Sequence, residues 1–180
     1  SGDGADLTAL LWSSIDNDDS RDLDQLAVAV PGERGDAAQR ILVAIADVDS
    51  RVRPGSAIDE HARINTTSVY TAAAVYPMLP EELSTGLTSL NPDGERLAIV
   101  VDMAIGDDGL VGRAEVYRAK VLNRAKLAYG SVAAWLDGTG PMPEPVARVP
   151  GMAEQLRMQD RAAQRMREQR VRQGALSLQS

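Results

Sequence analysis

The chain contains two apolar runs, Leu26–Val30 and Ile41–Val48, on either side of a segment rich in turn residues. Short aliphatic and β-branched runs bounded by Gly and Pro are typical of strands. The second run is apolar at nearly every position, which predicts a strand buried on both faces. Further on, Arg96–Ile105 and Leu110–Leu122 flank the turn sequence GDDG and predict a β-hairpin.

The remaining patterned segments predict mostly short elements. Capping residues and prolines at first-turn positions mark helix starts, whereas a dense run of prolines marks a loop. In chain order, we expect a helix at 57–63 capped by Ser56, a short extended piece at 66–70, a helical turn at 80–83, a short helix at 131–136, a loop at 138–150 with four prolines, and a long helix at 152–172.

This order of elements predicts an α+β fold with a mixed sheet, short helices and one long C-terminal helix. Strands followed by a hairpin and a final helix do not form the regular alternation of a βαβ series. The length of 180 residues matches a single domain.

Composition narrows the class of protein. Hydrophobic residues make up 44% and charged residues 25%, as in soluble globular domains. No apolar run reaches the roughly 18 residues that a membrane span needs, and no basic-then-apolar leader is present at the start. The absence of cysteine excludes disulfides and thiolate metal sites, and it agrees with the cytoplasmic location that we expect.

Two compositional features bear on function. Aromatic residues are only 3% and phenylalanine is absent, so each Tyr or Trp is a candidate for a role beyond packing. The net charge of −7 opposes nucleic-acid binding, because phosphate contacts need Lys and Arg. However, residues 16–24 hold five aspartates and one arginine, so much of the excess charge lies in one segment that metal ions could neutralise.

That aspartate run is a candidate magnesium site. Asp16, Asp22 and Asp24 bracket a loop that enters a strand, and Mg²⁺ takes oxygen ligands from one or two carboxylates plus water and phosphate. A calcium loop is excluded because Arg21 stands where glycine is needed and Ala27 where the closing glutamate belongs. A solvated acidic turn remains the alternative.

Four blocks in order give a resemblance to a known family. The chain resembles the RNB domain, the catalytic domain of the ribonuclease II and ribonuclease R family, from Ser14 onward. The blocks are SSIDNDDSRDLDQLAVAV, LVAIADVDSRVRPGSAIDEHAR, TSVYTAAAVYPMLPEELSTGLTSLNP and AKLAYGSVAAWL.

The resemblance implies roles for the aspartates. By the family motif, Asp16, Asp22 and Asp24 would bind Mg²⁺, and Asp24 would be the residue most closely tied to cleavage. Gln25 stands where the family usually has a fourth aspartate, which puts a second metal ion in doubt because an amide is a weaker ligand for a hard cation.

The resemblance also implies roles for two tyrosines. Tyr70 would contact RNA away from the scissile bond and help to set the final short product, and Tyr129 would stack on a base near the 3′ end. Stacking on an aromatic ring binds any base, so it suits single-stranded RNA of any sequence. The alternative is that both are half-buried core tyrosines.

Other candidates favour structural interpretations. We expect His61 to be a surface residue rather than a ligand or base, and Trp12 and Trp135 to anchor packing. Arg157, Arg161 and Arg165 share one helix face, which we expect to be solvated or to pair with protein outside this chain; contact with RNA phosphate is the alternative.

The resemblance therefore implies a magnesium-dependent 3′-to-5′ exoribonuclease that hydrolyses single-stranded RNA to nucleoside 5′-monophosphates. We expect a lead-in at residues 1–13 and the N-terminal portion of the catalytic domain at 14–180, inactive alone, with the rest of that domain and flanking OB-fold domains as partners. Two alternatives remain: a non-catalytic RNA-binding or regulatory relative with a decayed site, which Gln25 favours, and a structural domain with an acidic surface loop.

Overall fold

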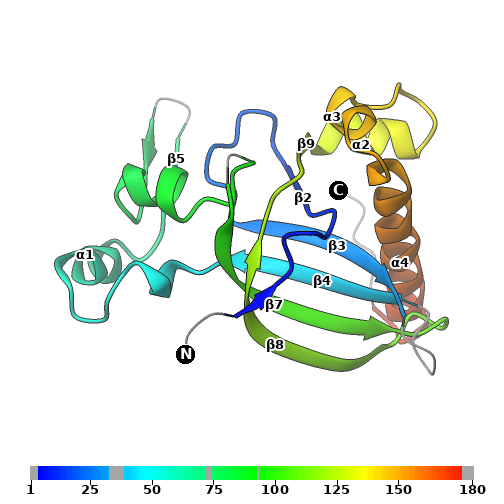
Figure 1. The fold of residues 1–180 in the computed structure, drawn as a ribbon, viewed down its shortest axis with the longest axis horizontal. Coiled ribbons are helices and arrows are strands. Elements are labelled where there is room, and N and C mark those ends of the chain that lie inside the picture. Colours follow the sequence, from blue (N-terminus) through cyan, green and yellow to red (C-terminus); the bar gives the residue numbers. More distant parts are fainter. Residues whose placement is uncertain (1–3, 33–38, 72–73, 93, 176–180) are drawn as a thin grey trace.

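The computed structural model describes residues 4–32, 39–71, 74–92 and 94–175. Within these ranges, seven strands form one mixed sheet in the order β1-β8-β7-β4-β3-β2-β9 (Figure 1). The predicted α+β class with a mixed sheet is confirmed. The strands of this sheet are β1 (Ala5–Asp6), β2 (Ser13–Asp16), β3 (Gln25–Pro31), β4 (Gln39–Ala46), β7 (Arg96–Ile105), β8 (Val111–Val121) and β9 (Ala125–Ala128).

The helices are short except the last. α4 spans Met152–Arg172, which is the long helix that the sequence predicted. The others are η1 (Val48–Ser50), α1 (Ala57–Asn65), the π-helical η2 (Glu82–Leu87), α2 (Tyr129–Leu136) and α3 (Glu144–Arg148). None of the helices in the described ranges has the length and apolar character needed to span a membrane.

Strands β7 and β8 form the predicted antiparallel hairpin, with Val100 opposite Tyr117. Its turn contains Gly109 at φ +80°, and a Cβ there would collide with the carbonyl group of Arg165 in α4. Only glycine meets both conditions, so the turn can lie against the helix.

One face of the central strands carries the main core. Leu26, Val28, Leu42, Val100 and Val121 are buried there. The core is closed by the segment before β2, where Trp12 is fully buried and its indole N–H donates to the Leu7 carbonyl at 2.8 Å. The expectation that Trp12 anchors packing is confirmed.

The prediction that the Ile41–Val48 strand is buried on both faces is wrong. Leu42 and Ala44 are buried in β4, whereas Ile45 is 45% exposed, and the strand ends at Ala46. α4 packs mainly against β3 and less against β4, so it leaves part of this sheet face uncovered. An apolar sequence alone does not reveal how far a covering helix reaches.

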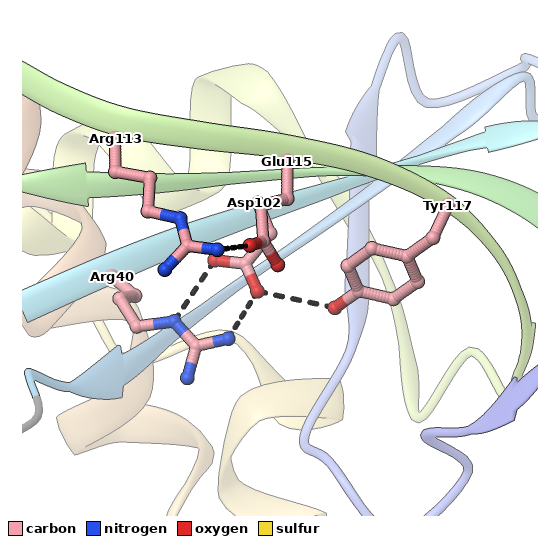
Figure 2. A network of polar contacts seen from close by, with 5 residues as sticks. All are labelled: Arg40, Asp102, Arg113, Glu115 and Tyr117. Atoms are coloured by element: carbon pink, nitrogen blue, oxygen red, sulfur yellow. Dashed lines mark hydrogen bonds and ion pairs between the residues drawn. The ribbon is translucent and has the colours of Figure 1, made fainter.

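A polar network joins the neighbouring strands β4, β7 and β8 (Figure 2). Asp102 on β7 is 5% exposed, pairs with the Arg40 guanidinium and accepts a hydrogen bond from the Tyr117 hydroxyl at 3.1 Å. Burial and the Asp102 charge raise the pKa of Tyr117. The neighbouring pair of Arg113 and Glu115 lies beside it on β8.

A second core lies between β9 and the helices α2, α3 and α4, around Leu127, Val146 and Met152. α3 lies within the segment that was predicted to be a loop, so that prediction is wrong for residues 144–148. Pro143 and Pro145 fall at the start of α3, where a missing N–H costs nothing. α2 also begins two residues before its predicted start.

Residues 48–71 and 74–87 form an arm at one end of the sheet, away from α4 (Figure 1). Ser56 caps α1 as predicted, accepting the Asp59 N–H at 3.3 Å. Only Val69–Tyr70 of the predicted extended piece is a strand, β5, which pairs with β6 (Val75–Tyr76). Thr66 instead ends α1 in the left-handed region at φ 63°.

Candidate nucleic-acid and metal site

The strand pairing places Asp16 beside Tyr129. Asp16 is the last residue of β2 and lies opposite Ala128 in the parallel strand β9. Tyr129 follows directly as the first residue of α2. Two predicted site residues that are more than a hundred positions apart are thus brought to one end of the sheet.

Asp22 and Asp24 lie in the loop that leads into β3. Leu23 between them is 1% exposed and belongs to the main core, which holds the loop down at its centre. The Asp24 carbonyl accepts the Ala46 N–H at 2.9 Å, so β4 fixes the loop where it enters the sheet. Gln25 is the first residue of β3 and is exposed.

The charges of Asp16 and Asp22 act on the carboxyl group of Asp24. Partial loss of hydration raises the pKa of Asp24, and the negative charges of Asp22 and Asp16 raise this pKa further. A carboxyl group with a raised pKa among like charges is typical of a site that takes a cation or a proton. The predicted trio, Asp16, Asp22 and Asp24, therefore forms an acidic cluster in which Asp24 feels the charge of the other two.

In this conformation, the trio does not converge on one point. The described residues include no group of three acidic, histidine or cysteine side chains that could hold a metal ion. Asp16 accepts its own loop's Asn17 N–H at 2.7 Å, and Asp22 accepts the Tyr70 hydroxyl at 2.6 Å. The hard oxygen donors and mutual repulsion still fit Mg²⁺, which needs only one or two carboxylates and completes its shell with water and phosphate.

Tyr70 reaches the acidic loop from the arm. It lies on β5, is 62% exposed, and donates to Asp22 across 48 positions of sequence. This hydrogen bond, together with partial burial and the charges of Asp22 and Asp24, raises the pKa of Tyr70. A cleft of about 450 Å³ runs beside the pair and is lined by Asn17, Asp19, Ser20, Arg21, Asp22, Tyr70, Pro77, Glu81, Ser84 and Thr85.

Both predicted tyrosines are surface residues. Tyr129 is 53% exposed and Tyr70 62%, so neither is a core tyrosine, and each has an accessible ring. A third exposed tyrosine, Tyr76, lies opposite Val69 on β6 and is 63% exposed. The sequence interpretation gave Tyr76 no role.

The weaker candidates have local partners. His61 is exposed, with its Nε2 2.9 Å from the Asn65 amide nitrogen. Trp135 is partly buried against the second core, and the Arg157 guanidinium lies 5.1 Å from its ring centre. The other two arginines of the α4 face also contact this chain: Arg161 pairs with Glu154 at 2.8 Å, and Arg165 donates to Gln39 at 2.8 Å.

Sequence reasoning missed two buried polar residues that hold the acidic segments. The Ser89 hydroxyl accepts the Leu23 N–H at 3.0 Å and donates to the Arg21 carbonyl at 3.1 Å. The Asn123 amide donates to the Ser14 hydroxyl at 3.0 Å and to the Leu90 carbonyl at 2.9 Å. A serine and an asparagine far away in sequence carry no motif that would reveal these contacts.

The structure thus has an acidic loop at one end of a mixed sheet, with the exposed Tyr70 bonded to it, as expected from the sequence blocks that resemble a known family. The chain belongs to the RNB domain family, which matches it over residues 5–180. The family resemblance inferred from the four sequence blocks is confirmed.

The most similar proteins include ribonucleases R. The chain is 38% identical to ribonuclease R of Vibrio parahaemolyticus over 92% of its length, and 38% identical to that of Escherichia coli K12 over 97%. It spans about a fifth of each relative, 20% and 21%. Ribonuclease R of Mycoplasma genitalium in complex with ribose-methylated single-stranded RNA has a TM-score of 0.86 and 28% identity, covering 100% of this chain and 27% of that one.

The fold also occurs in a protein described as a pseudonuclease. Yeast Ssd1 has a TM-score of 0.64 at 18% identity, covering 83% of this chain and 18% of that one. At this identity, the likeness concerns the fold alone.

Proposed function

We propose that this chain carries the metal-binding part of a 3′-to-5′ exoribonuclease that releases nucleoside 5′-monophosphates from single-stranded RNA. Membership of the RNB family and the ribonuclease R relatives support an exoribonuclease. One observation carries the proposal for this chain: the charges of Asp16 and Asp22 raise the pKa of Asp24, and the exposed Tyr70 donates a hydrogen bond to Asp22.

The residues have distinct tasks in this proposal. Tyr129, beside Asp16, stacks on a base near the 3′ end, and Tyr70 contacts RNA further along and limits how short the product becomes. Asp16, Asp22 and Asp24 would hold Mg²⁺, with Asp24 most closely tied to cleavage. When bound, the metal ion supplies Lewis-acid stabilisation and an activated water for hydrolysis of the phosphodiester bond.

A non-catalytic RNA-binding relative is the second candidate. Gln25 favours it, because the amide lacks the charge of the family's usual fourth aspartate. The separation of the carboxylates within the described residues favours it too. The intact trio at positions 16, 22 and 24 opposes it.

Substituting Asp24 in the intact protein tests the proposal. Asp24→Asn should abolish magnesium-dependent release of mononucleotides while RNA affinity stays nearly unchanged, because a catalytic metal ligand acts mainly in the transition state. Asp18→Asn is the matched control: Asp18 is exposed in the same loop and loses the same charge. Hydrolysis by Asp24→Asn within about threefold of wild type, a loss of only about 0.7 kcal/mol in transition-state stabilisation, would overturn the assignment.

A further inference from the structure

A buried polar network joins the two segments that carry the acidic cluster. We infer that Ser89 and Asn123 are positioning residues that set the spacing between Asp16 and the pair Asp22 and Asp24, and thereby the affinity for a divalent cation. This inference rests on the proposed function, because it assumes that the cluster takes a metal ion.

Ser89 holds the loop on both sides of Asp22. Its side chain has 0% exposure, and its single hydroxyl bridges the Arg21 carbonyl and the Leu23 N–H. The adjacent Leu90 N–H donates to the Leu23 carbonyl at 2.8 Å. The backbone that displays Asp22 and leads to Asp24 is therefore fixed by a segment more than sixty positions away.

Asn123 holds β2, the strand that ends at Asp16. Its side chain is 3% exposed and donates from Nδ2 to the hydroxyl of Ser14, two residues before Asp16. The same nitrogen donates to the Leu90 carbonyl, and Oδ1 accepts the Ala125 N–H at 3.1 Å, at the start of β9. Asn123 thus ties β2 and β9 to the residue that follows Ser89.

Together these bonds form one continuous path between the carboxylates. From the Asp16 strand, the path runs through Ser14, Asn123, Leu90 and Ser89 to Leu23 in the Asp22–Asp24 loop. Replacing either side chain by alanine removes the side-chain hydrogen bonds and leaves buried backbone groups without partners, which allows the two segments to shift.

The expected effect is on metal affinity. Residues that orient metal ligands without binding the metal ion themselves typically contribute 10- to 100-fold to metal affinity. Thr88 provides a matched control, since it is buried next to Ser89 and its hydroxyl donates to the Leu83 carbonyl at 2.9 Å, away from the acidic loop. Thr88→Val removes a buried hydroxyl and its hydrogen bond but leaves the path between the carboxylates intact.

Mn²⁺ binding to the intact protein, followed by electron paramagnetic resonance, tests the inference, with thermal unfolding measured in parallel. We expect the Mn²⁺ Kd to rise about 10- to 100-fold in Ser89→Ala and in Asn123→Ala. Thr88→Val should keep the wild-type Mn²⁺ Kd even if its unfolding temperature falls by as much as that of Ser89→Ala or Asn123→Ala. If Ser89→Ala does not fold, the Mn²⁺ Kd of Asn123→Ala tests the inference instead.

Two results would overturn the inference, and they differ in what else they affect. Unchanged Mn²⁺ affinity in folded Ser89→Ala or Asn123→Ala, with the wild type binding normally, would refute the positioning role and leave the proposed function intact. No Mn²⁺ binding by the wild type at millimolar concentration would refute both the inference and the metal-dependent function on which it rests.

Discussion

At the scale of single residues, the site is held in an electrostatically unfavourable state. The pKa of Asp24 is raised by partial loss of hydration and by the charges of Asp22 and Asp16. A carboxyl group whose pKa is higher in the folded than in the unfolded state lowers stability once it ionises. A bound cation would relieve this repulsion, which links the stability of the fold to occupancy of the site.

Removing the Asp24 charge should therefore stabilise the metal-free fold. Below the ordinary aspartate pKa of about 3.9, Asp24 is protonated and causes no electrostatic penalty. This stability of the folded state is lost as the pH rises through the raised folded-state pKa, so the penalty is fully present at neutral pH. We expect Asp24→Asn to melt at a higher temperature than wild type at pH 7 in EDTA, with the difference shrinking near pH 3.5. A lower melting temperature for Asp24→Asn at pH 7 in EDTA would show that the carboxylate is stabilised by partners.

Gln25 should weaken metal binding without abolishing it. Gln25→Asp adds an anionic oxygen next to Asp24, and an added carboxylate strengthens the binding of a hard cation. The magnesium concentration for half-maximal RNA hydrolysis should fall in this variant. Titration of magnesium for both proteins measures it, and an unchanged or higher requirement would count against a second metal ion at this position.

The sequence predicted the charged and aromatic residues of the candidate site, but not the residues that hold their segments in place. Asp16, Asp22, Asp24, Tyr70 and Tyr129 belong to recognisable motifs. Ser89 and Asn123 act on backbone groups of segments that only the folded topology brings near. Such contacts depend on distance in space, and residue type at one position does not encode them.

At the scale of elements, α4 supplies hydrogen bonds to a strand edge that β2 leaves unpaired. β2 pairs with β3 only at Ala27, so the backbone of Ala29 has no strand partner on that side. Gln155 of α4 supplies both bonds, accepting the Ala29 N–H and donating to its carbonyl at 2.5 Å each. The helix was predictable from its sequence pattern, but this docking was not, because nothing in the sequence distinguishes Gln155 from the other glutamines of this polar helix.

Gln155→Ala should destabilise the protein. It leaves the N–H and C=O of Ala29 buried without partners, which costs about 1–3 kcal/mol. The matched control is Gln164→Ala on the exposed face of the same helix, where Gln164 bonds only Asp160; this change should cost less than about 0.5 kcal/mol. Urea titrations measure the free energy of unfolding of both variants. Equal losses for the two variants would contradict the claim that Gln155 stabilises the docking of α4 on β3.

Errors in the predicted elements have a common physical origin. The proline-rich segment 138–150 was assigned to a loop, yet α3 begins at the positions where proline is tolerated. The apolar run in β4 was assigned two buried faces, yet α4 covers only part of one. Local sequence specifies which element is possible, whereas burial depends on neighbours that are distant in sequence.

At the scale of the whole molecule, the sheet and the arm bring the functional groups to one region. The parallel pairing of β2 with β9 sets Asp16 beside Tyr129. The arm carries Tyr70 to Asp22, and the cleft runs along this contact. In the proposed function, the exposed rings of Tyr70 and Tyr129 would give single-stranded RNA stacking surfaces near the carboxylates.

Tyr129→Ala should weaken the binding of single-stranded RNA to the intact protein. One stacked base contributes about 1–3 kcal/mol, so the Kd should rise by roughly 5- to 150-fold, with little dependence on base identity. Tyr129→Phe keeps the ring and should bind like wild type. Fluorescence anisotropy with oligonucleotides of different sequence measures this, and an unchanged Kd for Tyr129→Ala would remove Tyr129 from the RNA path.

The central claim is that the acidic cluster supports metal-dependent removal of nucleotides from the 3′ end of RNA. Its most direct test is a time course of the intact protein on 5′-labelled single-stranded RNA, with and without magnesium, in which the released products are identified. The account predicts progressive shortening from the 3′ end, nucleoside 5′-monophosphates as the product, and no reaction in EDTA. Stable binding of the RNA without cleavage at any magnesium concentration would contradict it.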